Sequence, residues 1–412
     1  MHIFIVSNSP GELIGWVKPV INSLKKSSEK IEIIVILPPC QYASGKESQV
    51  LKSFSEAKEV ITPGQYLQYL LLRIKPSSFT SVKKGVVVFL GGDPFHALLI
   101  SRRMGLPAVA YFDRPSRKKS FAKFMVKDSS LKSKLEEKGI SPEKIAVVGD
   151  LVGDSLQVQG SSQKIKEIWK IRPSDKIVTF MPGSRNKEVI FMTPFFLSVA
   201  EAMKEEVPGI RFFLVLSPFV SREKLAQISE KKLRKVFLVR PVNLQRDSLG
   251  WKIVSQSGTE ATLIEADRYE IMSISDLVLT LPGTATAELG FLGIPMIVVL
   301  PLNKPTLIPL EGILGLVGSF PWLGHLLKKW ASKRYLEKFS FISLPNQILK
   351  KRVIPEVTGV IEPKDVTQSA IRLLKNSSQR AEISHQLKRT FCSKGAADKA
   401  AQIIMKIGRR GK

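Results

Sequence analysis

Short runs of Val, Ile and Phe recur along the first part of the chain, separated by stretches with helical periodicity. The apolar runs are nearly continuous and do not alternate with polar residues, which is typical of parallel strands buried on both faces of a sheet. Parallel strands need crossover connections, and amphipathic segments such as Leu13–Leu24 supply them. The pattern predicts a doubly wound α/β sheet with strands at His2–Val6, Ile31–Leu37, Val86–Leu90, Pro107–Phe112 and Ile145–Val148.

The same alternation restarts after a break. Gly, Ser and Gln residues interrupt it around Val152–Lys164, which we interpret as a linker. Beyond the linker the pattern predicts strand Lys176–Phe180, helix Lys187–Lys204, strands Arg211–Leu216 and Asp276–Thr280, helix Thr284–Leu292 and strand Pro295–Leu300. We therefore predict two Rossmann-like doubly wound domains, 1–155 and 156–376, the second with an insertion at 305–335, and then a helical tail at 377–412.

Two polar loops follow strands of the first domain, at the strand ends where open α/β sheets bind ligands. Ser7–Glu12 opens a helix, and its small residues, Gly11 among them, would let a ligand approach the backbone. The alternative is a capped turn in which Glu12 favours the helix dipole. In the second loop, Gly91–Asp93, the carboxylate could accept a proton from a bound hydroxyl, or Asp93 could simply cap the next helix.

Two loops of the second domain suit phosphate. Met181–Arg185 offers backbone N–H groups at a helix start together with the guanidinium of Arg185, and we favour phosphate binding there over a plain turn. Pro282–Glu288 has threonine hydroxyls and amides at another helix start, and Glu288, one turn further in, could accept both hydroxyls of a ribose. A Thr cap with a Glu in the first turn is the alternative. The two loops together favour a pyrophosphate site.

Charge narrows the possible partners. The 412 residues include 63 Lys and Arg against 36 Asp and Glu, a formal charge of +27, which suits nucleic acid, an anionic membrane surface or an anionic substrate. The sequence contains no recognised nucleic-acid-binding module, so nucleic acid is the least favoured of the three. Cys40 and Cys392 lack the spacing of zinc ligands, and the chain runs straight into a strand without a signal peptide. We therefore expect no metal and a reducing, cytoplasmic compartment.

One apolar segment could contact a membrane. Leu307–Leu327 carries a single charge, Glu311, but its prolines and glycines disfavour a spanning helix. We expect an interfacial hairpin on anionic lipid at the inner face of the cell membrane, and a buried helix pair is the alternative. Tyr66–Ile74 could form a second contact. The residues predicted to touch the membrane are Trp322, Leu326, Leu327, Lys328, Lys329 and Trp330.

Three motifs resemble a known family. Met181-Pro-Gly-Ser-Arg185, Gly283-Thr-Ala-Thr-Ala-Glu288 and Ser343-Leu-Pro-Asn346 occur in the order and spacing of the lipid-A-disaccharide synthases, and the segments Val148–Ser155 and Phe341–Glu356 are also similar to that family. The resemblance implies a B-type glycosyltransferase (GT-B) fold and inverting transfer of 2,3-diacylglucosamine from UDP to 2,3-diacylglucosamine 1-phosphate. It implies no metal and no cofactor.

The resemblance also implies roles for residues. The first domain would bind the acceptor, with Gly11 and Gly92 on that side, and Asp93 would match the family's candidate catalytic Asp. Asp93 and Glu12 are the two carboxylates that we place at strand ends beside glycines in this domain. We favour Asp93 as the base, because the resemblance puts the candidate base there and its side chain is short and follows a strand directly, and Glu12 would then orient the acceptor. The predicted UDP-binding residues are Gly183, Ser184, Arg185, Gly283, Thr284, Ala285, Thr286, Glu288 and Asn346.

Three departures from the family fall in the first domain. The first loop ends in Pro10-Gly11-Glu12 where the family has Ser-Gly-Asp, the run Asp93–His96 is shortened, and a tryptophan-containing stretch is replaced by Phe112–Pro115. The acceptor could therefore differ, which leaves a UDP-sugar transferase acting on another lipid-linked acceptor as the alternative. A catalytically silent lipid- or nucleic-acid-binding protein is a third hypothesis. The sequence leaves the oligomeric state open.

Overall fold

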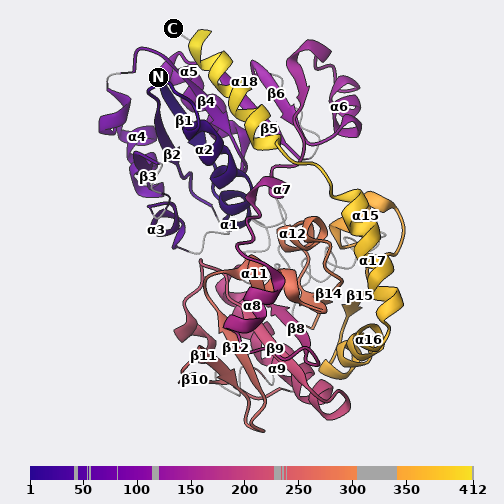
Figure 1. Cartoon of the computed structure of the whole chain (residues 1–412). Helices are drawn as coiled ribbons and strands as arrows, with labels where there is room; N and C mark the ends of the chain where they lie inside the picture. The colour runs from indigo at the N-terminus through magenta and orange to yellow at the C-terminus, as the bar shows by residue number, and fades with distance from the viewer. Residues whose placement is uncertain are drawn as a thin grey trace. The chain divides into compact units, whose positions relative to one another are not determined.

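The computed structural model describes residues 1–40, 45–52, 54, 57–80, 82–113, 120–226, 233, 236–237, 239–303 and 341–410. The chain divides into two compact units, shown in Figure 1. Unit 1 consists of Met1–Leu156 and Ser393–Lys412, and unit 2 of Gln157–Cys392. The segment 377–412, for which the sequence suggested a separate tail, is thus shared between the units.

Unit 1 is built on a seven-stranded sheet whose strand pairs are all parallel, as predicted. Its order is β3-β2-β1-β4-β5-β6-β7. The strands are β1 (His2–Val6), β2 (Glu32–Ile36), β3 (Glu59–Ile61), β4 (Gly85–Phe89), β5 (Ala108–Phe112), β6 (Lys123–Val126) and β7 (Ile145–Val147). The helices are α1 (Pro10–Glu12), the π-helical turn η1 (Leu13–Val17), α2 (Lys18–Lys25), α3 (Glu47–Lys52), α4 (Pro63–Leu72), α5 (Pro94–Met104), α6 (Ser129–Glu136), α7 (Val152–Ser155) and α18 (Ala396–Arg410), with 3₁₀ turns η2 (Ser77–Phe79) and η3 (Pro142–Lys144).

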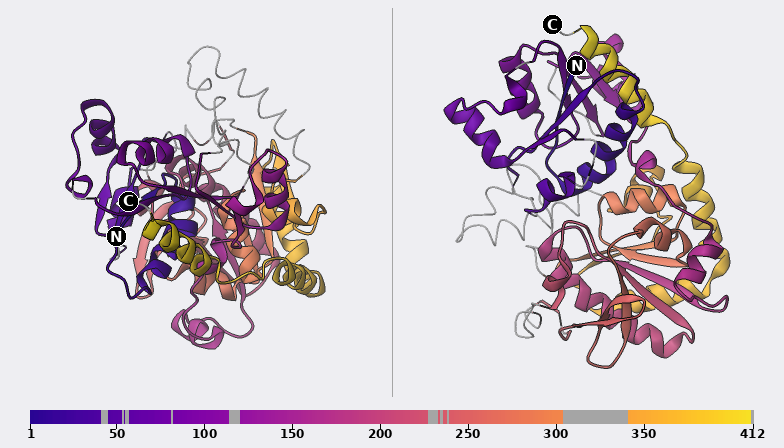
Figure 2. Two further views of the ribbon diagram at one scale, coloured as in Figure 1. Left: turned by 90° about the horizontal axis from the view of Figure 1, so that it is seen from above. Right: turned by 60° about the vertical axis from the view of Figure 1, so that its left-hand side comes forward.

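The last helix of the chain, α18, belongs to unit 1. It packs against α2 (Figure 1, Figure 2) and lies so close to the sheet that a Cβ on Gly408 would come within 2.7 Å of the Met1 sulfur. At its start, the carboxylate of Asp154 accepts hydrogen bonds from the backbone N–H groups of Gly395 and Ala397, both at 2.7 Å. These bonds cap the helix and fix it to the end of the first segment of unit 1.

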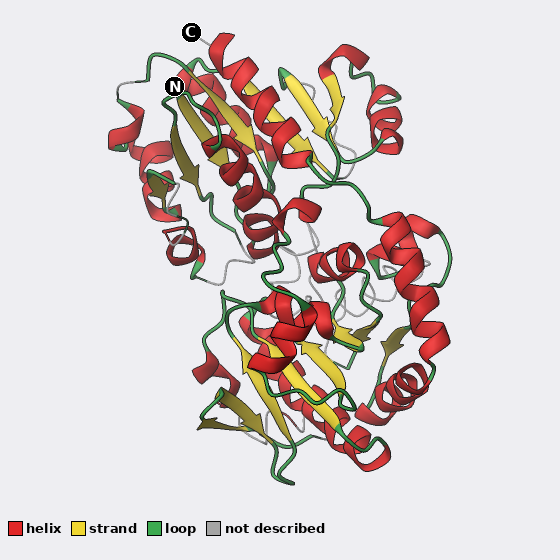
Figure 3. Ribbon diagram, in the orientation of Figure 1, coloured by secondary structure: helices red, strands yellow, loops and turns green. Residues whose placement is uncertain are grey.

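Unit 2 has an eight-stranded mixed sheet in the order β10-β11-β12-β9-β8-β13-β14-β15. The strands are β8 (Lys176–Met181), β9 (Ile210–Val215), β10 (Asn243–Asp247), β11 (Gly250–Val254), β12 (Glu260–Ile264), β13 (Leu277–Thr280), β14 (Met296–Pro301) and β15 (Glu356–Gly359). The helices, red in Figure 3, are α8 (Ser162–Ile168), α9 (Asn186–Glu206), α11 (Arg268–Ile274), α12 (Thr284–Leu292), α15 (Leu344–Leu349), α16 (Pro363–Lys375) and α17 (Ser377–Thr390), with a 3₁₀ turn η4 (Arg222–Ala226).

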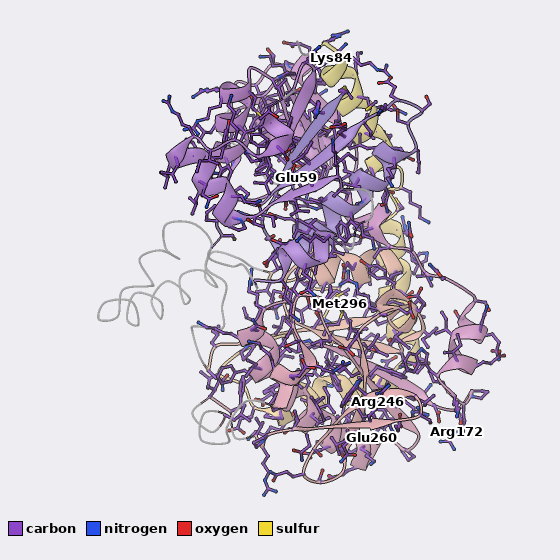
Figure 4. All side chains as sticks on the ribbon, turned by 90° about the vertical axis from the view of Figure 1, so that its left-hand side faces the viewer. Glu59, Lys84, Arg172, Arg246, Glu260 and Met296 are labelled. Carbon is purple, nitrogen blue, oxygen red and sulfur yellow. The ribbon has the colours of Figure 1, made fainter. Side chains whose placement is uncertain are left out.

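The parallel part of this sheet was predicted, but the antiparallel part was not. Strands β10, β11 and β12 pair antiparallel, and Figure 4 marks two side chains there, Arg246 on β10 and Glu260 on β12. Both residues are exposed, whereas Met296 at the start of β14 is fully buried. The parallel strands therefore form the core of unit 2, as their apolar runs predicted.

Within the described ranges, no helix is long and apolar enough to cross a membrane. The segment predicted to contact one, with Trp322, Leu326, Leu327, Lys328, Lys329 and Trp330, lies outside the described residues.

Candidate functional site

The first candidate site lies at the topological switch point of unit 1. Strands β1 and β4 are neighbours, and the connections that follow them lead to opposite sides of the sheet. Val6 pairs with Phe89 at the ends of these strands, so the two polar loops begin at the same level. Ser7 joins them, because its hydroxyl donates to the carbonyl of Leu90 at 2.8 Å. Switch points of this kind are where open α/β sheets bind ligands.

Glu12 connects the two loops through its carboxylate. Oε1 accepts from the backbone N–H of Gly92 at 3.1 Å, and Oε2 accepts from that of Ser9 at 3.3 Å. Gly91, at φ +115°, lies directly against this carboxylate, since a Cβ there would be 2.1 Å from Cδ of Glu12. Gly92, at φ +84°, lies against the side chain of Asn8 in the same way, at 2.6 Å. Only glycines fit these two positions.

Burial changes the acidity of Glu12. Desolvation raises the pKa of this carboxyl to about 7, while hydrogen bonds from Ser9 and Gly92 oppose the shift. The carboxyl can thus exchange a proton near neutral pH. In the sequence alone Glu12 was assigned to orientation, and the raised pKa is a property that a general base needs.

The same shift predicts a pH dependence of stability. Because the pKa of Glu12 is higher in the folded chain than the ordinary 4.5, ionisation favours unfolding, and stability is lost as the pH rises from about 4.5 through 7. The Glu12→Gln protein lacks this titration. The unfolding free energy of the variant minus that of the parent should therefore be larger at about pH 8 than at about pH 5, by on the order of 2 kcal/mol. Urea unfolding at both pH values measures this, and an equal difference at both would contradict it.

Asp93 lies on the second loop, exposed, at the N-terminus of α5. Its Oδ1 accepts from the backbone N–H of Phe95 at 2.8 Å, so the capping role that the sequence left open is present. A catalytic role for Asp93 stays a prediction. His96, in the first turn of α5, bonds through Nδ1 to the hydroxyl of the buried Tyr66 at 2.8 Å. Gly11, also predicted on the acceptor side, lies within α1.

Unit 2 has a switch point of the same kind between β8 and β13. Met181 pairs with Thr280 at the strand ends, so the loops carrying the two predicted phosphate motifs leave the sheet side by side. The structure therefore brings together Gly183–Arg185 and Gly283–Glu288, which are about a hundred residues apart in sequence.

In the first motif, Gly183–Arg185, backbone N–H groups already donate hydrogen bonds to a carboxylate of the protein. Oε2 of Glu188, a buried residue, accepts from the backbone N–H groups of Ser184 at 3.0 Å and Arg185 at 3.2 Å, and Oε1 accepts from Nη1 of Arg185 at 2.8 Å. A Cβ on Gly183 would be 2.4 Å from Oε2 of Glu188. Sequence reasoning missed Glu188, although a Glu at the third helical position is the usual signal of a capping box. Phosphate binding by these two N–H groups is therefore disfavoured while Glu188 holds them.

The second motif, Gly283–Glu288, begins at a helix N-terminus that is exposed. Gly283 is exposed at the N-terminus of α12, with φ +141°, and apart from its chain neighbours no described atom lies within 4 Å of where a Cβ would be. Among the described residues no side chain caps this helix, and Thr284 and Ala285 are partly exposed. Thr286 is buried and donates to the carbonyl of Gly283 at 2.8 Å. An uncapped helix N-terminus with an open glycine suits an anion.

Glu288 follows on the same helix and is buried. Its Oε1 accepts from Nη2 of Arg268 at 2.5 Å and from the hydroxyl of Tyr269 at 3.1 Å. The sequence did not predict that Arg268 and Tyr269 contact Glu288. No local pattern links the start of α11 to Glu288, which follows Arg268 by 20 residues.

Asn346, another predicted nucleotide contact, is fully buried. Its Nδ2 donates to the carbonyl of Ile354 and to Oε1 of Glu356, and its Oδ1 accepts from the N–H groups of Val353 and Ile354, all at 2.8 Å. These four bonds use the full capacity of the amide and assign it a structural role. A direct contact with nucleotide stays a prediction that these bonds disfavour.

Comparison with known proteins agrees with the resemblance seen in the motifs. The model of the lipid-A-disaccharide synthetase family matches residues 142–249, which include the Met181–Arg185 loop. Lipid-A-disaccharide synthase 2 of Legionella pneumophila is 27% identical over 263 residues, which is 63% of this chain and 56% of that protein. The chain thus matches little more than half the length of that relative. Lipid-A-disaccharide synthase of Pseudomonas putida is 23% identical over 423 residues, 98% of this chain and 97% of that protein.

Solved structures with the same fold include two proteins that are not described as lipid-A-disaccharide synthases. The UDP-GlcNAc 2-epimerase of Neisseria meningitidis, bound to UDP-GlcNAc, superposes with a TM-score of 0.54 at 16% identity over 100% of both chains. The calicheamicin glycosyltransferase CalG4 superposes with a TM-score of 0.54 at 14% identity, covering 99% of this chain and 98% of that one. By sequence the chain is therefore similar to the lipid-A-disaccharide synthases, and by fold it has the two-domain GT-B architecture.

Proposed function

We propose that the chain is an inverting glycosyltransferase that transfers 2,3-diacylglucosamine from UDP to 2,3-diacylglucosamine 1-phosphate and releases UDP, a step of lipid A biosynthesis. The observation that carries the proposal is the similarity to a lipid-A-disaccharide synthase over 98% of the chain, combined with polar loops at both switch points. In the reaction an acceptor hydroxyl attacks C1 of the donor sugar, the bond from C1 to the diphosphate breaks, and the proton passes to a carboxylate.

We assign the donor to unit 2. The pyrophosphate would bind the open N-terminus of α12 through Gly283, Thr284 and Ala285, and Glu288 would accept the ribose hydroxyls. Arg185, whose side chain is held by a hydrogen bond to Glu188, would place its guanidinium next to the leaving diphosphate. Its positive charge would stabilise the diphosphate, so this step would need no metal ion. Solved structures of this fold that contain UDP-GlcNAc or UDP support a UDP-sugar as the donor class.

We assign the acceptor to the switch point of unit 1. Glu12 and Asp93 are the carboxylates that follow strands β1 and β4. We propose that Glu12 takes the proton, since its pKa of about 7 matches the working pH of a base. Asp93, which caps α5 through one oxygen, would orient the acceptor with the other. This reverses the preference drawn from the sequence.

A membrane surface is the proposed location, on the cytoplasmic face of the cell membrane. Helix α4 buries Tyr66 and Tyr69 but leaves three apolar side chains exposed, Leu67 at 41%, Leu71 at 77% and Leu72 at 66%. Ile74, just beyond the helix, is 54% exposed and extends this apolar patch. Arg73 and Lys75 flank this patch, and Arg103 of α5 donates to the carbonyls of Tyr69 and Leu70 at 3.2 Å, which holds the end of the helix. An apolar face with basic flanks suits anionic lipid.

The liposome prediction follows from this patch. Changing Leu71 and Leu72 to Ser should weaken sedimentation with anionic liposomes by about tenfold or more, because two side chains no longer enter the lipid. The parent should also release as salt rises. Val360 of unit 2, which is 82% exposed, gives the matched control Val360→Ser. Equal binding by all three proteins would remove α4 from the membrane contact.

Mass spectrometry of the products tests the function directly. The protein is incubated with UDP-2,3-diacylglucosamine and with 2,3-diacylglucosamine 1-phosphate or other lipid-linked acceptors. A disaccharide 1-phosphate supports the proposal. Transfer to another acceptor alone would favour the second candidate, for which the altered acceptor-side loops argue, and UDP binding without transfer to any acceptor would contradict both.

A further inference from the structure

The proposed ribose site of unit 2 contains two residues that no motif indicates. Arg268 and Tyr269 begin α11 and both reach Oε1 of Glu288. Arg268 also donates to the hydroxyl of Tyr269, and its guanidinium stacks over that ring with 4.5 Å to the centroid. The three side chains thus form a closed network in which each member contacts the other two.

The two carboxylate oxygens of Glu288 differ in their hydrogen bonds to this network. The hydrogen bonds from Arg268 and Tyr269 both end on Oε1, and within the part of the chain that the structure describes none reaches Oε2. The side chain of Glu288 is only 5% exposed, and that of Arg268 is 21% exposed. A buried carboxylate with one oxygen held and the other unoccupied is oriented in advance for a further donor.

Backbone strain and charge are consistent with a dedicated role. Asp267, directly before Arg268, has φ +52° and ψ +35°, a left-handed conformation that costs energy in a residue other than glycine. Burial alone would lower the pKa of Arg268, but Glu288 and Tyr269 reverse the effect and raise it, so the guanidinium stays charged.

We infer that Arg268 and Tyr269 are positioning residues for nucleotide recognition: they hold Glu288 so that its free oxygen accepts the 2′-hydroxyl of a ribonucleotide. The inference rests on the proposed function, in which Glu288 binds the ribose. It adds a specificity to it, since the network selects ribonucleotides over 2′-deoxyribonucleotides.

The test compares the affinities of UDP and 2′-deoxy-UDP by calorimetry. The parent should prefer UDP by about tenfold or more, because the deoxy nucleotide has no 2′-hydroxyl to donate to Oε2 of Glu288. Arg268→Ala should weaken UDP binding by about tenfold or more and bring the ratio of the two affinities close to one. Tyr269→Phe removes one hydroxyl only and should retain the fold with a smaller fall in the ratio.

The control is Arg222→Ala. Arg222 pairs with Glu265 in an exposed salt bridge within the same unit, so its loss should leave both affinities unchanged. If Arg268→Ala and Tyr269→Phe lose affinity for the two nucleotides in equal proportion, the network is structural and the inference is overturned. A parent that binds UDP and 2′-deoxy-UDP equally well also overturns it, while the proposed function stands. A parent that binds neither overturns the proposed function and this inference with it.

Discussion

Glu12→Gln is expected to lower kcat by about 10²–10⁴-fold, the range for the loss of a positioned general base, with the fold and the affinity for UDP unchanged. In the parent the two oxygens of Glu12 accept from the N–H groups of Gly92 and Ser9 separately. Glutamine has a single acceptor oxygen, so it can keep one of these two bonds, while the proton acceptor is lost. In the parent, kcat should rise with pH through about 7, because Glu12 must be ionised to take the proton. That limb of the profile should disappear in the variant.

Asp93→Asn discriminates between the two carboxylates. Asparagine also caps helices well, so the contact with the N–H of Phe95 should persist, and we expect kcat to fall about tenfold as one orienting oxygen is lost. If this variant is inactive while Glu12→Gln turns over normally, Asp93 is the base, as the sequence suggested. Normal turnover in both variants would contradict the proposed mechanism.

A glycine pair provides a further control for the position of Glu12. Gly91→Ala should impair turnover like Glu12→Gln, because the new methyl group would occupy the place of the carboxylate. Gly105 at the end of α5 also has a positive φ, +65°, but no atom lies within 4 Å of where a Cβ would be. Gly105→Ala therefore introduces a methyl group at a positive φ without the clash and should leave kcat unchanged.

The core of both sheets could be predicted from the sequence, because strands such as β1 and β4 are apolar at almost every position. Among the strands that were missed, two kinds stand out, short strands and a polar strand. β3 has three residues, β6 has four, and both are too short to establish a period. β10, Asn243–Asp247, is polar and largely exposed, so it resembles a loop in sequence and is a strand only because β11 pairs with it.

The site was predictable at the level of loops and less so at the level of partners. Glycines and carboxylates directly after buried strands identified both switch points. The raised pKa of Glu12 arises from burial and could not be deduced from its neighbours in sequence. The bonds of Glu188 to its own loop and of Arg268 to Glu288 likewise depend on tertiary packing. Sequence similarity indicates which residues are candidates for the site, but the role of each residue depends on the side chains and backbone groups that it contacts in the folded protein.

Asn346 is the case where the two kinds of argument differ most, and Asn346→Ala is expected to lower the free energy of unfolding by about 3–5 kcal/mol. The substitution leaves a buried carbonyl, two buried N–H groups and the carboxylate of Glu356 each short of a partner. Glu356 retains the backbone and hydroxyl of Ser343, so the segment should loosen without losing every bond. Thermal and urea unfolding measure the loss.

The neighbouring Gln347 supplies the matched control for this prediction. It lies on the same helix, α15, and makes one exposed hydrogen bond, from Nε2 to the carbonyl of Phe341 at 3.0 Å. Gln347→Ala should therefore cost less than about 1 kcal/mol. UDP affinity, measured at a temperature where both variants are folded, separates the two roles of Asn346. If Asn346→Ala unfolds like the parent but no longer binds UDP, the residue contacts the nucleotide as the family motif implies, and the structural role argued from its four bonds is wrong.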